Sequence, residues 1–211
     1  MKVKAAIEAA PKKTFATAVD WPGWSRSGKT EELALEALVA YADRYAPIAK
    51  AAGEVFDPSR VDVDVVERGT GGAGTEFGVP SRIADEDRRA TTKAQAERLA
   101  RLVEAAWAAF ASTAAAAPEE LRKGPRGGGR DTSKMVGHVE EADGAYAREM
   151  GIKLKAPIEE VRQAMAEVLR QPSDGSPIAD RRWTARYAAH RIAWHALDHA
   201  WEIEDKSEPA G

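Results

Sequence analysis

Residues 186–205 read RYAAHRIAWHALDHAWEIED, and this stretch decides the fold and the candidate site of the chain. Coiled as an α-helix at about 100° per residue, it places three side chains together on one face: His195, His199 and Glu202. Arg191 and Asp198 lie at the margin of that face, whereas His190 points elsewhere. The opposite face is built of small or aliphatic side chains: Ala193, Ala196, Leu197 and Ala200. The pattern does not show which face of the helix is buried. The histidines therefore belong either to a solvent-exposed stripe or to a buried site.

Helical periodicity extends upstream of this stretch. It predicts four helices, at about Thr91–Ala117, Thr132–Met150, Pro157–Arg170 and Asp180–Asp205. Gly151 follows the second helix and Pro157 opens the third, and both are positions that helix ends favour. The C-terminal part of the chain, residues 91–211, is therefore expected to form a four-helix bundle.

The histidines of this bundle have the spacing of metal ligands. Two histidines four residues apart on a helix can reach one Zn²⁺ or similar ion together. His138, on the second predicted helix, shares an apolar face with Met135, Ala142 and Ala145 and is the natural third ligand. A single histidine on an apolar face is more often a hydrogen-bonded core residue, so that alternative stays open.

Two segments carry a family resemblance. RYAAHRIAWHALDHAWEIED and the upstream GHVEEADGAYARE, residues 137–149, resemble the DinB/YfiT-like superfamily over roughly Thr91 to Asp205. In that superfamily one histidine of the second helix and an HxxxH pair of the last helix bind a metal, and His138, His195 and His199 match those positions. The resemblance implies a divalent ion (Zn, Ni, Mn or Fe) with coordination positions left open for water or substrate. Some members use low-molecular-weight thiols such as mycothiol or bacillithiol in transferase or isomerase reactions.

Carboxylates near the three histidines are candidates for supporting roles. Glu202 either accepts a hydrogen bond from a ligand imidazole and fixes its tautomer, or acts as a general base beside the metal. Asp198 and Glu141 are weaker candidates. A solvated acidic helix end explains Asp198, Glu202, Glu204 and Asp205 equally well.

Arginines supply candidates for binding an anionic substrate. The segment LRKGPRGGGRD, residues 121–131, sets Arg122, Lys123, Arg126 and Arg130 in a glycine-rich loop before a predicted helix N-terminus, where anions bind readily. Arg126, Arg130 and Arg191 are the candidates for contacting substrate, although a solvated basic loop is the better explanation of the loop cations. No aromatic residues interleave with these cations, which argues against a nucleic-acid patch.

The first 68 residues predict a small β-β-α-β module. Strands are expected at Lys2–Glu8, Thr14–Val19 and Val61–Arg68, with one helix capped by Thr30 and running to about Ala46. The segment TFATAVDWPGWSRSGKTEELALEALVAY, residues 14–41, resembles the front half of HicB-like antitoxin domains. Pro22 and Gly23 match the turn of that family, and Gly28 and Thr30 match its helix start. Such a module either packs on the bundle or pairs with a second chain.

Within this module, GWSRSGKT at Gly23 to Thr30 satisfies the phosphate-loop pattern GxxxxGK[ST]. We do not interpret it as a nucleotide site, because such a fold needs several parallel βα units and the rest of this chain is helical. Glu31 and Glu32 would also stand where phosphate should lie.

Trp21 and Trp24 are expected in the core or at an interface. Residues 69–90, rich in glycine and charge, are expected to be a linker or a functional loop.

Composition sets the outer limits of function. The formal net charge is −3 with a pI near 5.9, so neither nucleic acid nor an anionic membrane is the expected main partner. The chain has no cysteine, so a disulfide, a thiolate ligand and a cysteine nucleophile are impossible. With no apolar run long enough for a signal peptide or a membrane span, we expect a cytoplasmic protein.

Together these patterns predict an α+β chain with a metal-dependent function. The first hypothesis is an enzyme in which a three-histidine ion activates a low-molecular-weight thiol or water for transfer, isomerisation or hydrolysis of a small substrate. The second is a non-catalytic binding or regulatory protein, with a structural metal and the HicB-like module as its interaction surface. A homodimer is compatible with either hypothesis.

Overall fold

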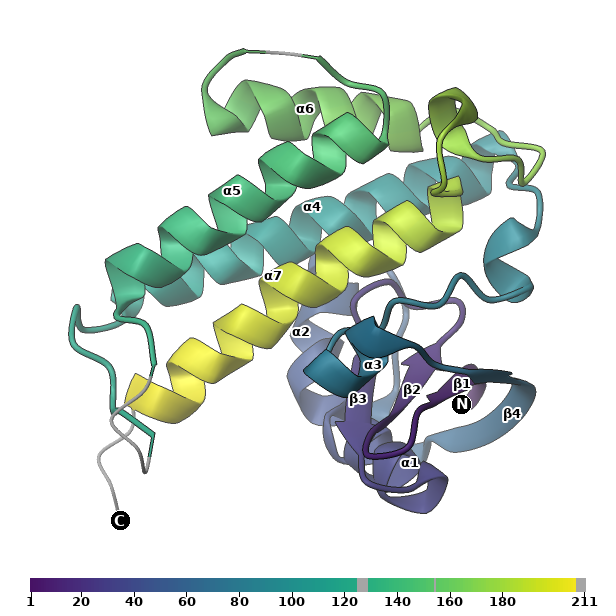
Figure 1. Ribbon diagram of the computed structural model, residues 1–211, viewed down its shortest axis with the longest axis horizontal. Coiled ribbons are helices and arrows are strands. Elements are labelled where there is room, and N and C mark those ends of the chain that lie inside the picture. The colour runs from purple at the N-terminus through teal and green to yellow at the C-terminus, as the bar shows by residue number, and fades with distance from the viewer. Residues whose placement is uncertain (125–128, 154, 208–211) are drawn as a thin grey trace.

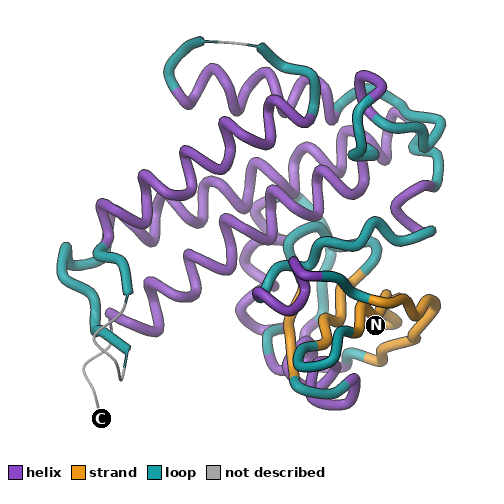
Figure 2. The backbone as a smooth tube through the Cα atoms, viewed as in Figure 1, coloured by secondary structure: helices purple, strands orange, loops and turns teal. Residues whose placement is uncertain are grey.

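The computed structural model describes residues 1–124, 129–153 and 155–207. It is of the mixed α+β class, which confirms the predicted class. A small sheet with short helices lies on one side, and four long helices form the rest (Figures 1 and 2). Within these residues, no helix combines the length and the apolar character needed to cross a membrane.

The N-terminal part contains a four-stranded sheet with the strand order β3-β2-β1-β4. Its strands are β1 (Lys2–Ala9), β2 (Thr14–Ala18), β3 (Ser25–Gly28) and β4 (Asp62–Thr70). Neighbouring strands run antiparallel except β1 and β4, which pair in parallel. The parallel pair requires a crossover, which helices α1 (Glu31–Ala40) and α2 (Ala42–Ala51) and the short 3₁₀ turn η1 (Pro58–Arg60) provide.

The predicted module was wrong in two details. We expected three strands, but Ser25–Gly28 pairs with β2 as a fourth, although its sequence SRSG has no apolar alternation. We also expected one helix, but the chain breaks at Tyr41, with φ −92° and ψ 4°, and continues as α2. Because GWSRSGKT forms an edge strand and Thr30 accepts a hydrogen bond from the Leu33 amide at 3.3 Å, this stretch is not shaped as a phosphate loop.

The segment 69–90 is tied to the sheet. It contains a short helix, α3 (Ala73–Phe77), and a 3₁₀ turn, η2 (Glu86–Arg88), where we expected no regular element. The Glu8 carboxylate of β1 accepts hydrogen bonds from the amides of Ser81 and Arg82, both at 3.1 Å, and from the Thr75 hydroxyl. Held in this way, the segment lies between β1 and the N-terminal half of the last helix.

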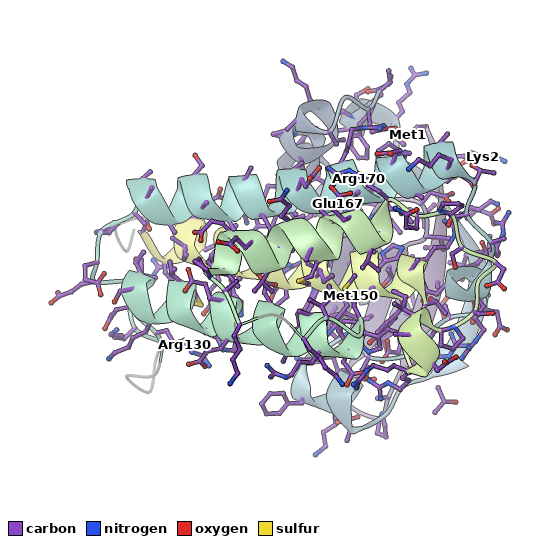
Figure 3. All side chains as sticks on the ribbon, turned by 90° about the horizontal axis from the view of Figure 1, so that it is seen from above. Met1, Lys2, Arg130, Met150, Glu167 and Arg170 are labelled. Carbon is purple, nitrogen blue, oxygen red and sulfur yellow. The ribbon has the colours of Figure 1, made fainter. Side chains whose placement is uncertain are left out.

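The bundle consists of α4 (Lys93–Ala116), α5 (Thr132–Glu149), α6 (Ile158–Leu169) and α7 (Ala185–Ser207). In Figure 1, α5 and α7 run side by side in front of α4, with α6 above. Figure 3 shows Arg130 and Met150 at the two ends of α5, and Arg170 with Glu167 where α6 meets α4. There Arg170 pairs with Glu104 of α4 at 2.5 Å.

Three of the predicted helices agree with the structure to within two residues at each end, but the last one starts later than expected. We placed its start at Asp180, whereas α7 begins at Ala185. Ala179 and Asp180 have positive φ values of 50° and 53°, which a continuous right-handed helix does not allow. The turn η3 (Ile178–Asp180) occupies this place.

One continuous core joins the N-terminal module to the bundle. Trp24 is fully buried and stacks on Tyr45 at 5.4 Å between ring centroids. Gly23, at φ +90°, lies so close to α7 that a Cβ there would stand 2.7 Å from Leu197 Cδ1. Arg26 pairs with Asp198 of α7 at 2.8 Å, which adds an ionic contact to the same junction.

Between α5 and α6, a buried carboxylate predicts a pH dependence of stability. The Asp143 side chain is 1% exposed, and burial raises its pKa to about 6 despite the Arg162 guanidinium at 2.8 Å. Since the folded pKa lies above the unfolded value, the native state binds the proton more tightly, and stability falls as the pH rises from about 4 to 6. The difference in unfolding free energy between wild type and Asp143→Asn should fall by on the order of 1–2 kcal/mol between pH 4.5 and 7. Urea unfolding at both pH values measures it, and a difference that does not change, or grows with pH, would contradict the assignment.

Candidate metal centre

Three histidines from two helices converge on one point. His138 lies on α5, and His195 and His199 lie one turn apart on α7. The Nε2 atom of His195 is 3.2 Å from Nε2 of His138 and 3.2 Å from Nε2 of His199. Each of the three offers one ring nitrogen, and these nitrogens all lie within 4.8 Å of one another.

The spacing fits a shared cation. Ligand nitrogens about 2.0 to 2.1 Å from a zinc ion stand roughly 2.9 to 3.4 Å apart when the angles at the metal lie between about 90° and 109°. Lone pairs of neutral imidazoles repel one another at 3.2 Å unless a proton or a cation lies between them. A divalent ion accepts the lone pairs of all three nitrogens. A proton on one ring forms a hydrogen bond to only one of the other nitrogens at a time and leaves the third lone pair without a partner.

Burial favours the neutral, metal-binding form of two of the three histidines, His195 and His138. The His195 ring is 6% exposed, and its burial lowers the pKa to about 2, with further lowering by His199 and Arg191. His138 is only half-buried, and its pKa is also lowered, first by burial and then by the charge of Arg130. Since metals bind neutral imidazole, these environments favour coordination over protonation near neutral pH.

Glu202 holds the outer nitrogen of one histidine. The His199 Nδ1–H group donates to Glu202 Oε2 at 2.9 Å, which leaves the lone pair on Nε2, facing the cluster. This hydrogen bond and the ammonium of Lys206 lower the pKa of Glu202 to about 2. Such an acidic carboxylate, engaged on both oxygens, suits a positioning role better than that of a general base.

His195 is fixed differently. Within the described residues, its buried Nδ1 atom has no hydrogen-bond partner. Its ring instead packs edge-on against Tyr146, 5.7 Å between centroids, and beside Trp194 at 6.2 Å. Aromatic packing therefore sets the orientation of this imidazole.

The other residues that the sequence analysis considered for the site lie outside the histidine cluster. Asp198 pairs with Arg26, and Glu141 is exposed but near enough for its charge to oppose the lowering of the His138 pKa; neither belongs to the histidine cluster. Arg191 lies over the rings of Tyr146 and Trp194, at 5.2 and 4.9 Å. Arg130 is close enough to lower the pKa of His138, while Arg126 lies outside the described residues. His190, which we expected to point away, contacts the Val19 carbonyl at 2.9 Å.

Sequence reasoning missed Lys206, Tyr146 and Trp194. Lys206 stands four residues after Glu202, and an i,i+4 acid–base pair is a signal that the pattern already contained. Trp194 directly precedes His195 on α7, so its sequence position already offered a signal, whereas Tyr146 reaches the site only through the packing of α5 against α7, which no local pattern shows.

The positioning role of Glu202 predicts a graded loss of metal affinity. Glu202→Ala should weaken Zn²⁺ binding by about 10- to 100-fold, because His199 loses the acceptor that fixes its tautomer. Glu202→Gln keeps an acceptor and should restore most of the loss. Glu204→Ala is the matched control, since that exposed carboxylate pairs with Arg44 and not with a histidine. Competition with a chelator of known affinity measures all three, and equal affinities in wild type and Glu202→Ala would refute the role.

Comparison with known proteins adds no relative to this picture. No protein family, curated protein or solved structure matches the chain.

Proposed function

We propose that this chain is a DinB-like metal-dependent enzyme acting on a small substrate. In this proposal, a divalent ion bound by His138, His195 and His199 activates a low-molecular-weight thiol or water for transfer, isomerisation or hydrolysis. The observation that carries the proposal is the convergence of three histidines between α5 and α7, where His195 Nε2 lies 3.2 Å from Nε2 of both His138 and His199.

Each residue of the cluster has a defined task in this proposal. The three Nε2 atoms bind the ion, Glu202 keeps His199 in the tautomer that binds, and Tyr146 with Trp194 shields the buried side of His195. A bound divalent ion supplies Lewis acidity, which lowers the pKa of a thiol or water molecule beside it. The half-buried His138 forms the more open wall, from which substrate reaches the centre.

The number of ligands favours a catalytic over a structural ion. Structural zinc sites have four protein ligands, whereas catalytic sites keep a position open. Within the described ranges, the cluster contains only the three histidines. The chain has no cysteine, so any thiol in the reaction comes from a cosubstrate.

The test combines metal content with turnover. Protein reconstituted separately with Zn²⁺, Ni²⁺, Mn²⁺ and Fe²⁺ is analysed for bound metal, then assayed with mycothiol or bacillithiol and 1-chloro-2,4-dinitrobenzene. In that reaction the thiol sulfur displaces chloride and the thiol proton passes to solvent. Hydrolysis of 4-nitrophenyl acetate tests the water branch. We expect metal-dependent turnover in one branch, lost in His199→Ala.

The two ways of failing have different meanings. Stoichiometric metal without turnover in either branch would favour the structural-ion alternative, in which the protein binds or regulates without catalysis. Absence of bound metal would remove the basis of both.

A further inference from the structure

A cavity lies beside α7, between the sheet, residues 80–87 and the N-terminal half of α7, on the face next to the histidine face. It is a narrow space that opens partly to solvent. Its wall on α7 consists of Tyr187, His190, Arg191 and Trp194, which recur at helical spacing as one stripe. Its opposite wall consists of β1, β2 and residues 80–87, including Glu8, Arg82 and Asp87. None of the three clustered histidines lines this cavity.

Arg191 is shared between the cavity and the metal centre. It stands one turn before His195 on α7, and its guanidinium lies over the rings of Tyr146 and Trp194. Trp194 lines the cavity, while Tyr146 packs against His195. A ligand that reaches Arg191 from the cavity therefore lies next to the candidate metal centre.

Most charges of the cavity wall are already paired within the protein. Glu8 accepts hydrogen bonds from Thr75, Ser81 and Arg82. The Arg82 guanidinium pairs with Glu67 at 2.5 Å, and Glu86 pairs with Arg89 at 2.8 Å. These groups need no ligand.

Arg191 is different. Within the described residues, its Nη1 atom is buried and has no hydrogen-bond acceptor. Two aromatic rings offset part of the desolvation of the charge, but a ring face does not replace a directional acceptor. A carboxylate matches a guanidinium in both charge and shape.

His190 is the second unsatisfied group of the wall. It is 8% exposed, and its Nε2–H group donates to the Val19 carbonyl at 2.9 Å, since a carbonyl can only accept. Its Nδ1 atom is then an acceptor, and within the described residues it is buried without a partner. A hydroxyl or amino group on a ligand would supply the missing donor. The nearby carboxylate of Asp87, 4.0 Å from His190 Nε2, disfavours a second anion at this end.

We propose that this cavity binds a small organic acid with an apolar body, whose carboxylate pairs with Arg191 and whose hydroxyl or amino group donates to His190. The apolar body lies against Tyr187, Trp194 and Ile7, which line the space between the two polar ends. The binding itself does not require the metal, so the inference goes beyond the proposed function.

The experiment uses 4-hydroxybenzoate and its neutral counterpart 4-hydroxybenzamide as probes, titrated calorimetrically into metal-free and Zn²⁺-loaded protein. We expect saturable binding of the acid in both forms, at least about tenfold tighter than the amide. Arg191→Gln should weaken acid binding by about tenfold or more and leave the amide unchanged. Arg148→Gln is the matched control, because Arg148 is exposed on α5 and does not line the cavity.

Several results would overturn the inference. These are no saturable binding of the acid, equal affinity for acid and amide, or undiminished acid binding by Arg191→Gln. Should that variant fail to fold, the comparison of acid and amide on the wild-type protein decides alone. Binding confined to the Zn²⁺-loaded form would mean that the acid coordinates the metal and not Arg191. Because the metal-free titration is independent of the ion, failure of the metal proposal and failure of this one are told apart.

Discussion

Replacing His195 by alanine is expected to reduce bound metal from about one ion per chain to a level indistinguishable from none. His195 is the central member of the cluster, since its Nε2 atom is the one that lies 3.2 Å from both of the other two. Its removal leaves His138 and His199, two ligands without the shared neighbour that links them. Two imidazoles alone bind a divalent ion far more weakly than three.

The measurement is metal content after dialysis against trace Zn²⁺, together with the rise in melting temperature on adding Zn²⁺. His190→Gln is the matched control, because His190 lies on the same helix but contacts the Val19 carbonyl and not the cluster. We expect the control to bind metal as wild type does. Equal metal content in His195→Ala and wild type would show that the ion, if any, is held elsewhere.

The sequence predicted the helical bundle well because its signals are local. Gly151 after α5 and Pro157 before α6 mark helix ends within a few residues. The same periodicity placed His195 and His199 together on one face of the last helix and His138 on an apolar face of the second, but it did not show which face of the last helix is buried. Only the start of α7 was misplaced, since nothing in a local pattern shows that Ala179 and Asp180 adopt positive φ.

The N-terminal module was predicted less completely because its pairing is not local. β3 has a polar sequence and forms through hydrogen bonds to β2 across the turn at Pro22 and Gly23. Likewise, no short-range pattern shows that residues 69–90 fold back onto Glu8. The cavity beside Arg191 depends on that return, so it was not visible from the sequence, although Arg191 itself was a candidate for contacting substrate.

The largest expected effect on stability comes from Leu197→Ala. Leu197 lies between His195 and His199 in sequence but faces the opposite way, fully buried against Gly23 of the N-terminal module. Removing its side chain opens a cavity at the junction of the module and the bundle, which should cost about 2 to 5 kcal/mol of unfolding free energy. Leu197→Met, which conserves volume, should cost less than about 1.5 kcal/mol. Urea unfolding followed by tryptophan fluorescence and by circular dichroism measures both.

The number of urea unfolding transitions in Leu197→Ala shows whether the N-terminal module and the bundle unfold together. Because one core runs through the module and the bundle, we expect both probes to report a single transition shifted to lower urea. Two transitions, of which only one shifts to lower urea, would mean that the two parts unfold independently.

Adding Zn²⁺ in the same experiment distinguishes a loss of core packing from a loss of metal binding. A ligand that binds only the native state adds stability set by its affinity, so Leu197→Ala should keep the wild-type increment on adding Zn²⁺, whereas His195→Ala should lose it.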